Sequence, residues 1–370
     1  VTPSSRYICS QCGTQFTRWM GKCPNCEVFG TIEEVTFPPA PSPSTEAVSR
    51  PISTITIQST TPITLSSTEW NRVLGRGLLP GSVILLAGNP GIGKSTLLLQ
   101  IAEDFATITG KTVLYISGEE NAEQIKLRAE RLSVGSPHLY LLSTSSLETA
   151  LSEARLLNPA LVIVDSLQAL RRSEDPAWAG SVTQVRDVAE SFTHFAKEHS
   201  RTVILVGHIT KEGVIAGPKY VEHLVDVVLS LEGEADLPFR YLRSIKNRFG
   251  ATGEIGIFCL TEEGFQDVHT PAHYLLSHRE GKRTGTAISI IREGSLYLPV
   301  EMQALVVPTK TSLPRRTSMG IHPNRLAVLL GVLEKYCRIY TSDRDVFFNV
   351  VGGMHISDPA SDLATCVAIA

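Results

Sequence analysis

Four cysteines near the start of the chain have a spacing typical of a metal site. The stretch "CSQCGTQFTRWMGKCPNC" contains Cys9, Cys12, Cys23 and Cys26. Each C-x2-C pair is a tight turn that directs two thiolates toward one point, and two such pairs form the closed tetrahedral shell that Zn²⁺ favours. The alternative is a set of unrelated free thiols. We expect a structural zinc ribbon over residues 1–36, with the metal supplying most of its folding free energy.

A second stretch, "LPGSVILLAGNPGIGKSTLLLQIA", predicts a phosphate-binding loop. It carries the pattern G-x-x-x-x-G-K-[ST] between an apolar strand and a helical segment. Backbone N–H groups of the loop and the helix N-terminus would hold the β-phosphate of ATP. Lys94 would reach the β- and γ-oxygens, and the Ser95 hydroxyl would bind Mg²⁺. The predicted nucleotide-binding residues of this loop are Gly88, Asn89, Pro90, Gly91, Ile92, Gly93, Lys94, Ser95 and Thr96.

Three more apolar strands end in a polar residue. "TVLYIS" is followed by Glu119, "ALVIVDS" contains Asp165, and "TVILVGH" ends at His208. Strands that alternate with helices predict a mainly parallel sheet covered on both faces, and ligands collect at the carboxyl ends of such strands. We expect Asp165 to hold Mg²⁺ through water, Glu119 to polarise the attacking water, and His208 to sense the γ-phosphate. A helix-capping acid and a structural histidine are the alternatives for Glu119 and His208.

The stretch "SIKNRFGATGE" contains two cations between segments that read as strands. These are Lys246 and Arg248, and the motif Lys246, Asn247, Arg248, Phe249, Gly250 adds an aromatic residue and a flexible glycine. This combination predicts a turn directed at an anion. The anion is either a nucleotide phosphate or a DNA phosphate, and a solvated hairpin tip is the third interpretation.

Composition limits the class of protein that positions these residues. The chain has 370 residues, 42% hydrophobic and 19% charged, which indicates a globular protein of two or three domains. The net charge of −3 excludes a simple basic nucleic-acid coat, so a polyanion site must be a local patch. No apolar run reaches the roughly 18 residues of a membrane span, and a cysteine cluster stands where a signal peptide would. Seven cysteines, four of them clustered, suit a reducing cytoplasm.

These motifs together resemble a known family. The central region is similar to the RecA core, in the branch that also holds the DnaB-type helicases. The whole chain resembles the bacterial RadA (Sms) family of recombination-repair proteins. The resemblance rests on the four-cysteine ribbon and on "GNPGIGKSTLLLQ", "YISGEEN", "LVIVDSLQAL", "GSVTQVRD", "VGHITKEG", "IAGPKYVEH" and above all "KNRFG".

The resemblance implies a DNA-dependent ATPase that forms a homo-oligomeric ring, a hexamer in the family. Lys246 and Arg248 would then complete the ATP site of the next subunit and act as catalytic residues with Lys94 and Glu119. Two loops would face the channel of the ring and bind single-stranded or branched DNA, one through Arg171 and Arg172 and the other through Lys211 and Lys219. A RecA-type recombinase is the implied partner. The residues by themselves also allow two solvated loops.

The last hundred residues predict strands at "GTAISIIREGSLYLPVEMQALVVPT" and "DVFFNVVGGM", and helices at "PNRLAVLLGVLEKYC" and from "SDPASDLA" onward. This segment resembles the Lon protease domain, cut short. Lon uses a serine and a lysine, but Ala360 stands at the serine position, Ser361 comes one residue late, and the lysine would lie beyond Ala370. We expect no peptidase activity, and a structural platform for the ring.

The expected organisation is therefore α/β: a zinc ribbon (1–36), a linker rich in Pro, Ser and Thr (37–66), a RecA-like core (67–270) and an incomplete α+β Lon-like domain (271–370). Branch migration of recombination intermediates is the expected activity. A KaiC-like autokinase or ATP switch, which shares the phosphate-binding loop and the pair Glu119–Glu120, is an alternative. A non-motor ATP-binding adaptor is another.

Overall fold

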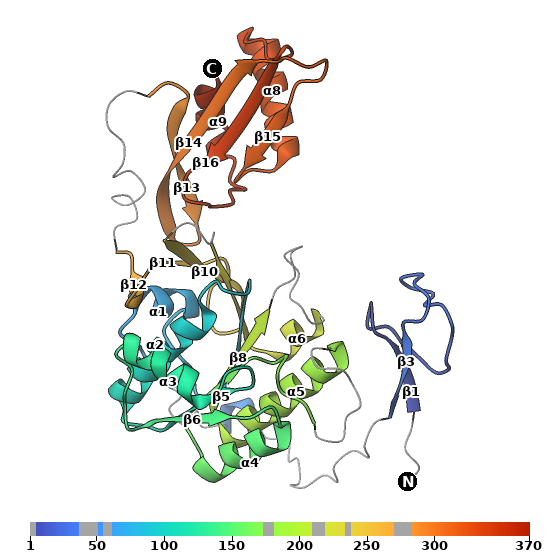
Figure 1. Ribbon diagram of the computed structural model, residues 1–370, viewed down its shortest axis with the longest axis vertical. Coiled ribbons are helices and arrows are strands. Elements are labelled where there is room, and N and C mark those ends of the chain that lie inside the picture. Colours follow the sequence, from blue (N-terminus) through green and yellow to red (C-terminus); the bar gives the residue numbers. More distant parts are fainter. Residues whose placement is uncertain are drawn as a thin grey trace.

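The fold of the chain comes from a computed structural model (Figure 1). It describes residues 5–36, 51–54, 61–172, 181–208, 219–233, 238–269 and 283–370. Most of the expected linker, at 37–50 and 55–60, lies outside these residues. So does Lys211, one of the expected DNA-binding residues. No helix in the described part of the chain is long and apolar enough to cross a membrane.

The N-terminal unit is a small antiparallel sheet. Its three strands have the order β2-β1-β3 and comprise β1 (Ser5–Cys9), β2 (Gln15–Phe16) and β3 (Ile32–Thr36). Its buried hydrophobic residues are Cys9, Cys23 and Ile32 alone among those described. Such a small core supports the expectation that the cysteine cluster stabilises this unit.

The central unit is a nine-stranded sheet with the order β12-β11-β10-β9-β4-β8-β7-β5-β6. The six strands from β9 to β6 in this order are parallel, and β10 to β12 are antiparallel. This confirms the predicted mainly parallel sheet. The strands are β4 (Val83–Gly88), β5 (Val113–Ser117), β6 (Leu139–Ser143), β7 (Leu161–Asp165), β8 (Thr202–His208), β9 (Val227–Glu232), β10 (Phe239–Asn247), β11 (Ile255–Thr261) and β12 (Gly264–Asp267).

Helices cover both faces of this sheet because its central strands are apolar on both sides. In β4, Ile84 packs into one hydrophobic cluster and Leu85 into the other. The first cluster includes α1 (Thr68–Leu74), α2 (Lys94–Thr109) and α3 (Ala122–Arg131), and the second includes α4 (Leu147–Leu157), α5 (Val182–His199) and α6 (Lys219–Leu224).

The central unit begins earlier than the composition suggested. Ile63 and Leu78 exchange backbone hydrogen bonds of 2.8 and 2.9 Å, and Leu65 is buried in the first hydrophobic cluster. Residues 61–66 were expected to belong to the linker 37–66. They are instead part of the core, since two apolar residues in a run of Thr, Pro and Ser find partners that only the folded sheet provides.

The C-terminal unit is an α+β sandwich. Strands β13 (Thr286–Glu293), β14 (Leu296–Pro308) and β16 (Arg344–Val350) are antiparallel, and β15 (Arg316–Met319) runs parallel to β16 at one edge. Helices α8 (Pro323–Cys337) and α9 (Ser361–Ile369) cover one face. Buried and exposed residues alternate along β13, as a sheet covered on one side requires. The predicted strands and helices of this segment are all present.

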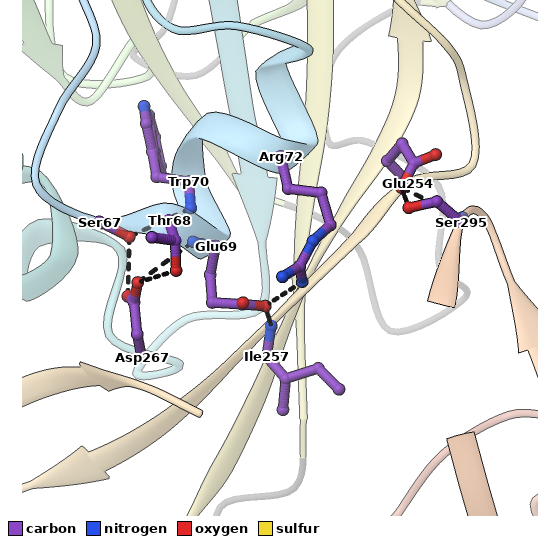
Figure 2. Close-up of polar contacts among 9 residues, drawn as sticks. All are labelled: Ser67, Thr68, Glu69, Trp70, Arg72, Glu254, Ile257, Asp267 and Ser295. Carbon is purple, nitrogen blue, oxygen red and sulfur yellow. Dashed lines mark hydrogen bonds and ion pairs between the residues drawn. The ribbon is translucent and has the colours of Figure 1, made fainter. Parts of the chain in front are cut away.

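The C-terminal unit packs against the hairpin formed by β10 and β11. Arg243 on β10 forms an ion pair of 2.5 Å with Glu293 on β13. Ser295, in the turn after β13, donates a 2.6 Å hydrogen bond to Glu254 at the start of β11 (Figure 2). The two contacts lie on either side of the hairpin tip, which carries the KNRFG motif. The C-terminal unit therefore holds the hairpin next to its tip.

Helix α1 fixes the same hairpin from the core side. The Asp267 carboxylate accepts hydrogen bonds from the first residues of α1 and its cap, including Ser67 Oγ at 2.7 Å. The buried Glu69 carboxylate accepts from Ile257 N at 2.9 Å, in the middle of β11, and from Arg72 (Figure 2). Burial makes these contacts stronger than they would be in water.

Candidate functional site

The four N-terminal cysteines converge as their spacing predicted. Their Sγ atoms all lie within 4.8 Å of one another, with Cys9–Cys26 and Cys12–Cys23 each at 3.6 Å. A tetrahedral zinc ion with Zn–S bonds of about 2.3 Å separates its sulfurs by about 3.8 Å. The donor set fits zinc in both number and distance.

Two similar turns place these sulfurs. In each one, a backbone N–H donates to the carbonyl of the first cysteine four residues earlier: Gly13 to Cys9 and Glu27 to Cys23, both at 2.8 Å. Both donors have positive φ, 72° and 58°. The chain therefore reverses tightly enough to direct both thiolates of a pair to one side.

The predicted phosphate-binding loop joins β4 to α2 at the carboxyl edge of the sheet. A Cβ on Gly88 would lie 2.8 Å from the carbonyl oxygen of Leu231, and a Cβ on Gly93 would lie 2.8 Å from the Phe265 ring. Gly93 also has a φ of 109°, which side chains rarely allow. Helix α2 starts directly afterwards at Lys94, so its free N–H groups face the loop and suit a phosphate.

Lys94 lies folded back on its own loop. Its ammonium group donates to the carbonyl oxygens of Gly88 at 2.8 Å and Asn89 at 3.0 Å. Burial lowers the pKa of Lys94, and the nearby carboxylates of Asp165 and Glu119 act against that shift. The three predicted residues are thus gathered around one place.

Tyr115 contacts Asp165, one of the two predicted Mg²⁺ ligands, and the sequence analysis missed it. Its hydroxyl donates a 2.6 Å hydrogen bond to Asp165 Oδ2. Its pKa lies well above the ordinary value because the ring is buried and the Asp165 carboxylate is adjacent. The sequence contains only a faint signal, a polar atom within the otherwise apolar strand β5.

The adjacent acids Glu119 and Glu120 have different surroundings. Glu119 accepts a short hydrogen bond from the hydroxyl of Ser166, the buried residue that follows Asp165. Glu120 instead forms a two-pronged ion pair with Arg128 on α3, at 2.8 and 2.5 Å. Only Glu119 is thereby tied to the end of β7, where Asp165 lies.

His208 ends β8, and its backbone pairs with Gly88 at the start of the loop. This position fits a residue that senses the γ-phosphate. The structure describes only the backbone of His208, so its predicted role remains a prediction.

The KNRFG motif spans the end of β10 and the turn after it. Lys246 donates to the carbonyl oxygens of Glu222 at 2.6 Å and Val225 at 2.8 Å, at the end of α6. Arg248 Nη1 lies 3.2 Å from Asp226 Oδ1. Burial and the nearby Arg248 guanidinium lower the pKa of Lys246.

Asn247 fixes the turn to α1. Its side chain donates to the carbonyl of Leu74 at 3.1 Å and accepts from Phe249 N at 2.9 Å. Gly250 lies against Gly75, where a Cβ would come within 3.3 Å of the opposite backbone. The aromatic Phe249 is exposed.

The expected DNA-binding residues are only partly described. Arg171 is exposed and lies two residues before the stretch 173–180, which is outside the described residues. Arg172 is paired with Asp187 on α5, and its Nη2 also donates to Ser191 Oγ at 3.3 Å. Lys219 begins α6, and only its backbone is described. A phosphate at Arg172 would therefore have to share the guanidinium with Asp187 or replace it.

The mainly parallel sheet, with a phosphate-binding loop at one edge and a cationic hairpin at the other, defines a RecA-like P-loop ATPase fold joined to a zinc ribbon. Comparison with known families agrees. Residues 64–214 match the AAA domain, and residues 7–34 match the rubredoxin metal binding domain.

Curated relatives are similar over almost the whole chain, and each is called DNA repair protein RadA. The Bacillus subtilis protein is 42% identical over 377 residues, covering 99% of this chain and 82% of the relative. The Mycobacterium tuberculosis H37Rv protein is 43% identical, covering 99% and 78%. The Aquifex aeolicus protein is 42% identical, covering 98% and 82%. The chain belongs to the RadA family.

Proposed function

We propose that the protein is a DNA-dependent ATPase of recombinational repair. It assembles as a ring, by family resemblance a hexamer, binds single-stranded DNA in its channel, and drives branch migration alongside a RecA-type recombinase. The observation that carries the proposal is the position of the KNRFG turn, on the opposite edge of the sheet from the nucleotide loop of the same chain.

Strand register gives the separation of the two edges. Asn247 pairs with Val227, the first residue of β9, and Val227 pairs with Ile84 near the start of β4. Gly88, where the loop begins, is four residues further along β4, or about 13 Å at the rise of a strand. A cation at the turn faces away from its own ATP. In a ring it would be free to meet the ATP held by a neighbouring subunit.

In this arrangement each chain contributes to two ATP sites. Its nucleotide loop forms one half of its own site, and its KNRFG turn forms one half of the neighbouring subunit's site. The loop and the N-terminus of α2 bind the phosphates, and Lys94 exchanges its carbonyl partners for the β- and γ-oxygens. Ser95 and Asp165 would hold Mg²⁺, which neutralises phosphate charge. Glu119, oriented by Ser166, accepts a proton from the attacking water. Arg248 and Lys246 of the adjacent subunit stabilise the charge that develops on the γ-phosphate.

DNA binding rests on loop cations repeated around the ring. A net charge of −3 does not prevent it, because a lumen lined by the same few cations from every subunit is locally basic. Lys219→Ala should weaken DNA-stimulated hydrolysis and flatten the dependence of binding on salt. An unchanged salt dependence would count against a phosphate contact at Lys219.

Mixed rings test the in-trans site. Lys94→Ala subunits have a defective nucleotide loop and an intact turn, and Lys246→Ala subunits have the reverse. Each variant alone should lose turnover. In an equal mixture about a quarter of the interfaces of a cyclic ring combine the two intact halves, so hydrolysis should return. A mixture that assembles and stays inactive would refute the proposal.

Labelled ATP separates this function from the autokinase alternative. We expect free phosphate and no label retained on the protein. The pairing of Glu120 with Arg128 supports this expectation, because it leaves Glu119 as the acid tied to the end of β7. Retained label that depends on Glu119 would favour the kinase.

A further inference from the structure

Asp226 is a buried acid at the amino edge of the sheet, and the function described above does not use it. It is 3% exposed and lies between α6 and β9. One carboxylate oxygen accepts from Val83 N at 3.0 Å and from Lys197 Nζ on α5 at 2.5 Å. The other accepts from Arg248 Nη1 at 3.2 Å. A buried carboxylate needs such partners to offset its lost hydration.

The backbone of Asp226 also forms hydrogen bonds with Val83 and Arg248. Its N–H donates to the carbonyl of Val83 at 2.9 Å, and its own carbonyl accepts from Arg248 N at 3.1 Å. Asp226 therefore fixes Arg248 twice, through its main chain and its side chain. It also fixes both to the first residue of β4, the strand that leads into the nucleotide loop.

Arg248 is held at one end and free at the other. Its side chain is 54% exposed, although one guanidinium nitrogen contacts Asp226. A guanidinium has five N–H groups in a planar fork, so most of them stay available for a second partner. Lys197 lies on the same carboxylate and contributes a second positive charge, which leaves the charge of Arg248 only partly offset.

We propose that Asp226 is a positioning residue of the in-trans site. It orients Arg248 so that the free side of the guanidinium faces the triphosphate held by the next subunit. Asp226 touches no substrate itself and acts through Arg248. This inference rests on the proposed ring function, and it adds a residue on which the neighbour's ATP hydrolysis depends.

A second reading is that Asp226 only stabilises the edge of the sheet. Lys197→Gln is the matched control for that reading. The substitution removes the ammonium group of Lys197, another partner of the same carboxylate, and leaves Arg248 in place. Lys197 Nζ also donates to Gly81 O at 3.0 Å. If Asp226 were only structural, Lys197→Gln and Asp226→Asn would lower turnover in proportion to their loss of thermal stability. We expect Lys197→Gln to keep turnover within about twofold, because Lys197 is half exposed and the buried carboxylate keeps Val83 N and Arg248 as partners.

The experiment uses Asp226→Asn in the full chain. Turnover by this variant should fall about a hundredfold, the loss that a 1 Å misplacement produces, with unchanged binding of a fluorescent ATP analogue. Mixing it with Lys94→Ala subunits should then restore hydrolysis, because the nucleotide loop of Asp226→Asn is intact and the turn of Lys94→Ala is intact. Full turnover by Asp226→Asn alone, or no recovery in the mixture, would overturn the inference.

The Lys246→Ala mixture distinguishes this inference from the function on which it rests. If Lys246→Ala is rescued and Asp226→Asn is not, only the role of Asp226 fails. If neither is rescued, the in-trans site fails as well.

Arg248→Lys tests the same contact if Asp226→Asn does not fold. A lysine keeps the positive charge but lacks the planar fork that serves Asp226 and a phosphate together. Its turnover should match that of Arg248→Ala. Turnover above half of the unmodified level would overturn the inference.

Discussion

The ammonium group of Lys246 lies 2.6 Å from the carbonyl oxygen of Glu222, so this lysine caps the last turn of α6 in its own chain. A cation at a helix C-terminus is favourable because the last carbonyls of the helix have no partner within it. Helix α6 contains the end of residues 209–223, the second of the two stretches expected to face DNA. The contact thus connects the KNRFG turn, the proposed in-trans element, with helix α6.

The pH dependence of turnover should report the charge of Lys246. Its pKa is lowered from 10.5 by burial and by Arg248, so it loses its proton at a lower pH than a free lysine. As the pH is raised, turnover should therefore begin to fall before the pH reaches 10.5, the ordinary pKa of a lysine. In Lys246→Arg the cation stays protonated, and the decline should move to higher pH. An unchanged decline would assign it to another group, such as Lys94, whose pKa is also lowered.

Tyr115→Phe should weaken the binding of Mg²⁺ at the site. The change removes the hydroxyl that donates to the Asp165 carboxylate, a loss of about 1.5–3 kcal/mol in stability, as for a hydrogen bond to a charged group. Loss of a group that orients a metal ligand typically costs about 10–100-fold in metal affinity. We expect a similar rise in the Mg²⁺ concentration for half-maximal turnover. Tyr140→Phe, on the exposed edge strand β6, is the control and should change neither quantity.

Zinc removal should unfold the ribbon alone. Cys12→Ser breaks the four-sulfur shell, and a colorimetric chelator should then find no zinc released on denaturation. Because the ribbon has almost no hydrophobic core of its own, it should unfold without the metal, and the spectroscopic signals of its residues should become those of an unfolded chain. The main thermal transition should persist, since the central sheet has separate cores. Cys337→Ser changes an exposed cysteine outside the cluster and should keep the metal.

Glu293→Gln should loosen the hairpin that carries KNRFG. It breaks the pair with Arg243 at the junction with the C-terminal unit, near the Glu254–Ser295 contact (Figure 2). We expect a stability loss of about 1–3 kcal/mol, because a hydrogen bond to a charged group is lost in a mostly buried place. Turnover should also fall, with ATP binding unchanged. Glu262→Gln on the exposed turn before β12 is the control. Equal turnover in the two variants would contradict a link between the C-terminal unit and the turn.

No peptidase activity is expected from Ser361. Its side chain is 1% exposed, and its hydroxyl donates to the carbonyl of Asp358 at 2.8 Å. A nucleophile must be accessible and must face a base. Ala360 holds the cap position of α9 and has no hydroxyl to offer. A fluorophosphonate probe should leave the chain unlabelled. Labelling that disappears in Ser361→Ala would refute this expectation.

The sequence by itself determined what depends on local spacing. Two C-x2-C turns place their own sulfurs, because the hydrogen bond that closes each turn spans four residues. Gly91 and Gly93 adopt a positive φ within the loop itself, whereas Gly88 is required by the carbonyl of Leu231, which the fold brings close. The apolar strands predicted the sheet, since strands buried on both faces must be apolar throughout. Helix α5 begins after Ser181, whose side chain caps it by accepting from Gln184 N, a signal that lies within four residues of the chain.

The tertiary structure alone decided the partners of the polar side chains. Tyr115 and Asp165 are 50 residues apart in the chain, and Lys197 and Asp226 are 29 apart. They meet only because strand order and register bring their elements together. The same holds for the pairing of Arg172 with Asp187, which the sequence could not distinguish from a free cation. Contacts of this kind are set by which strands are neighbours, and no local spacing in the chain encodes that order.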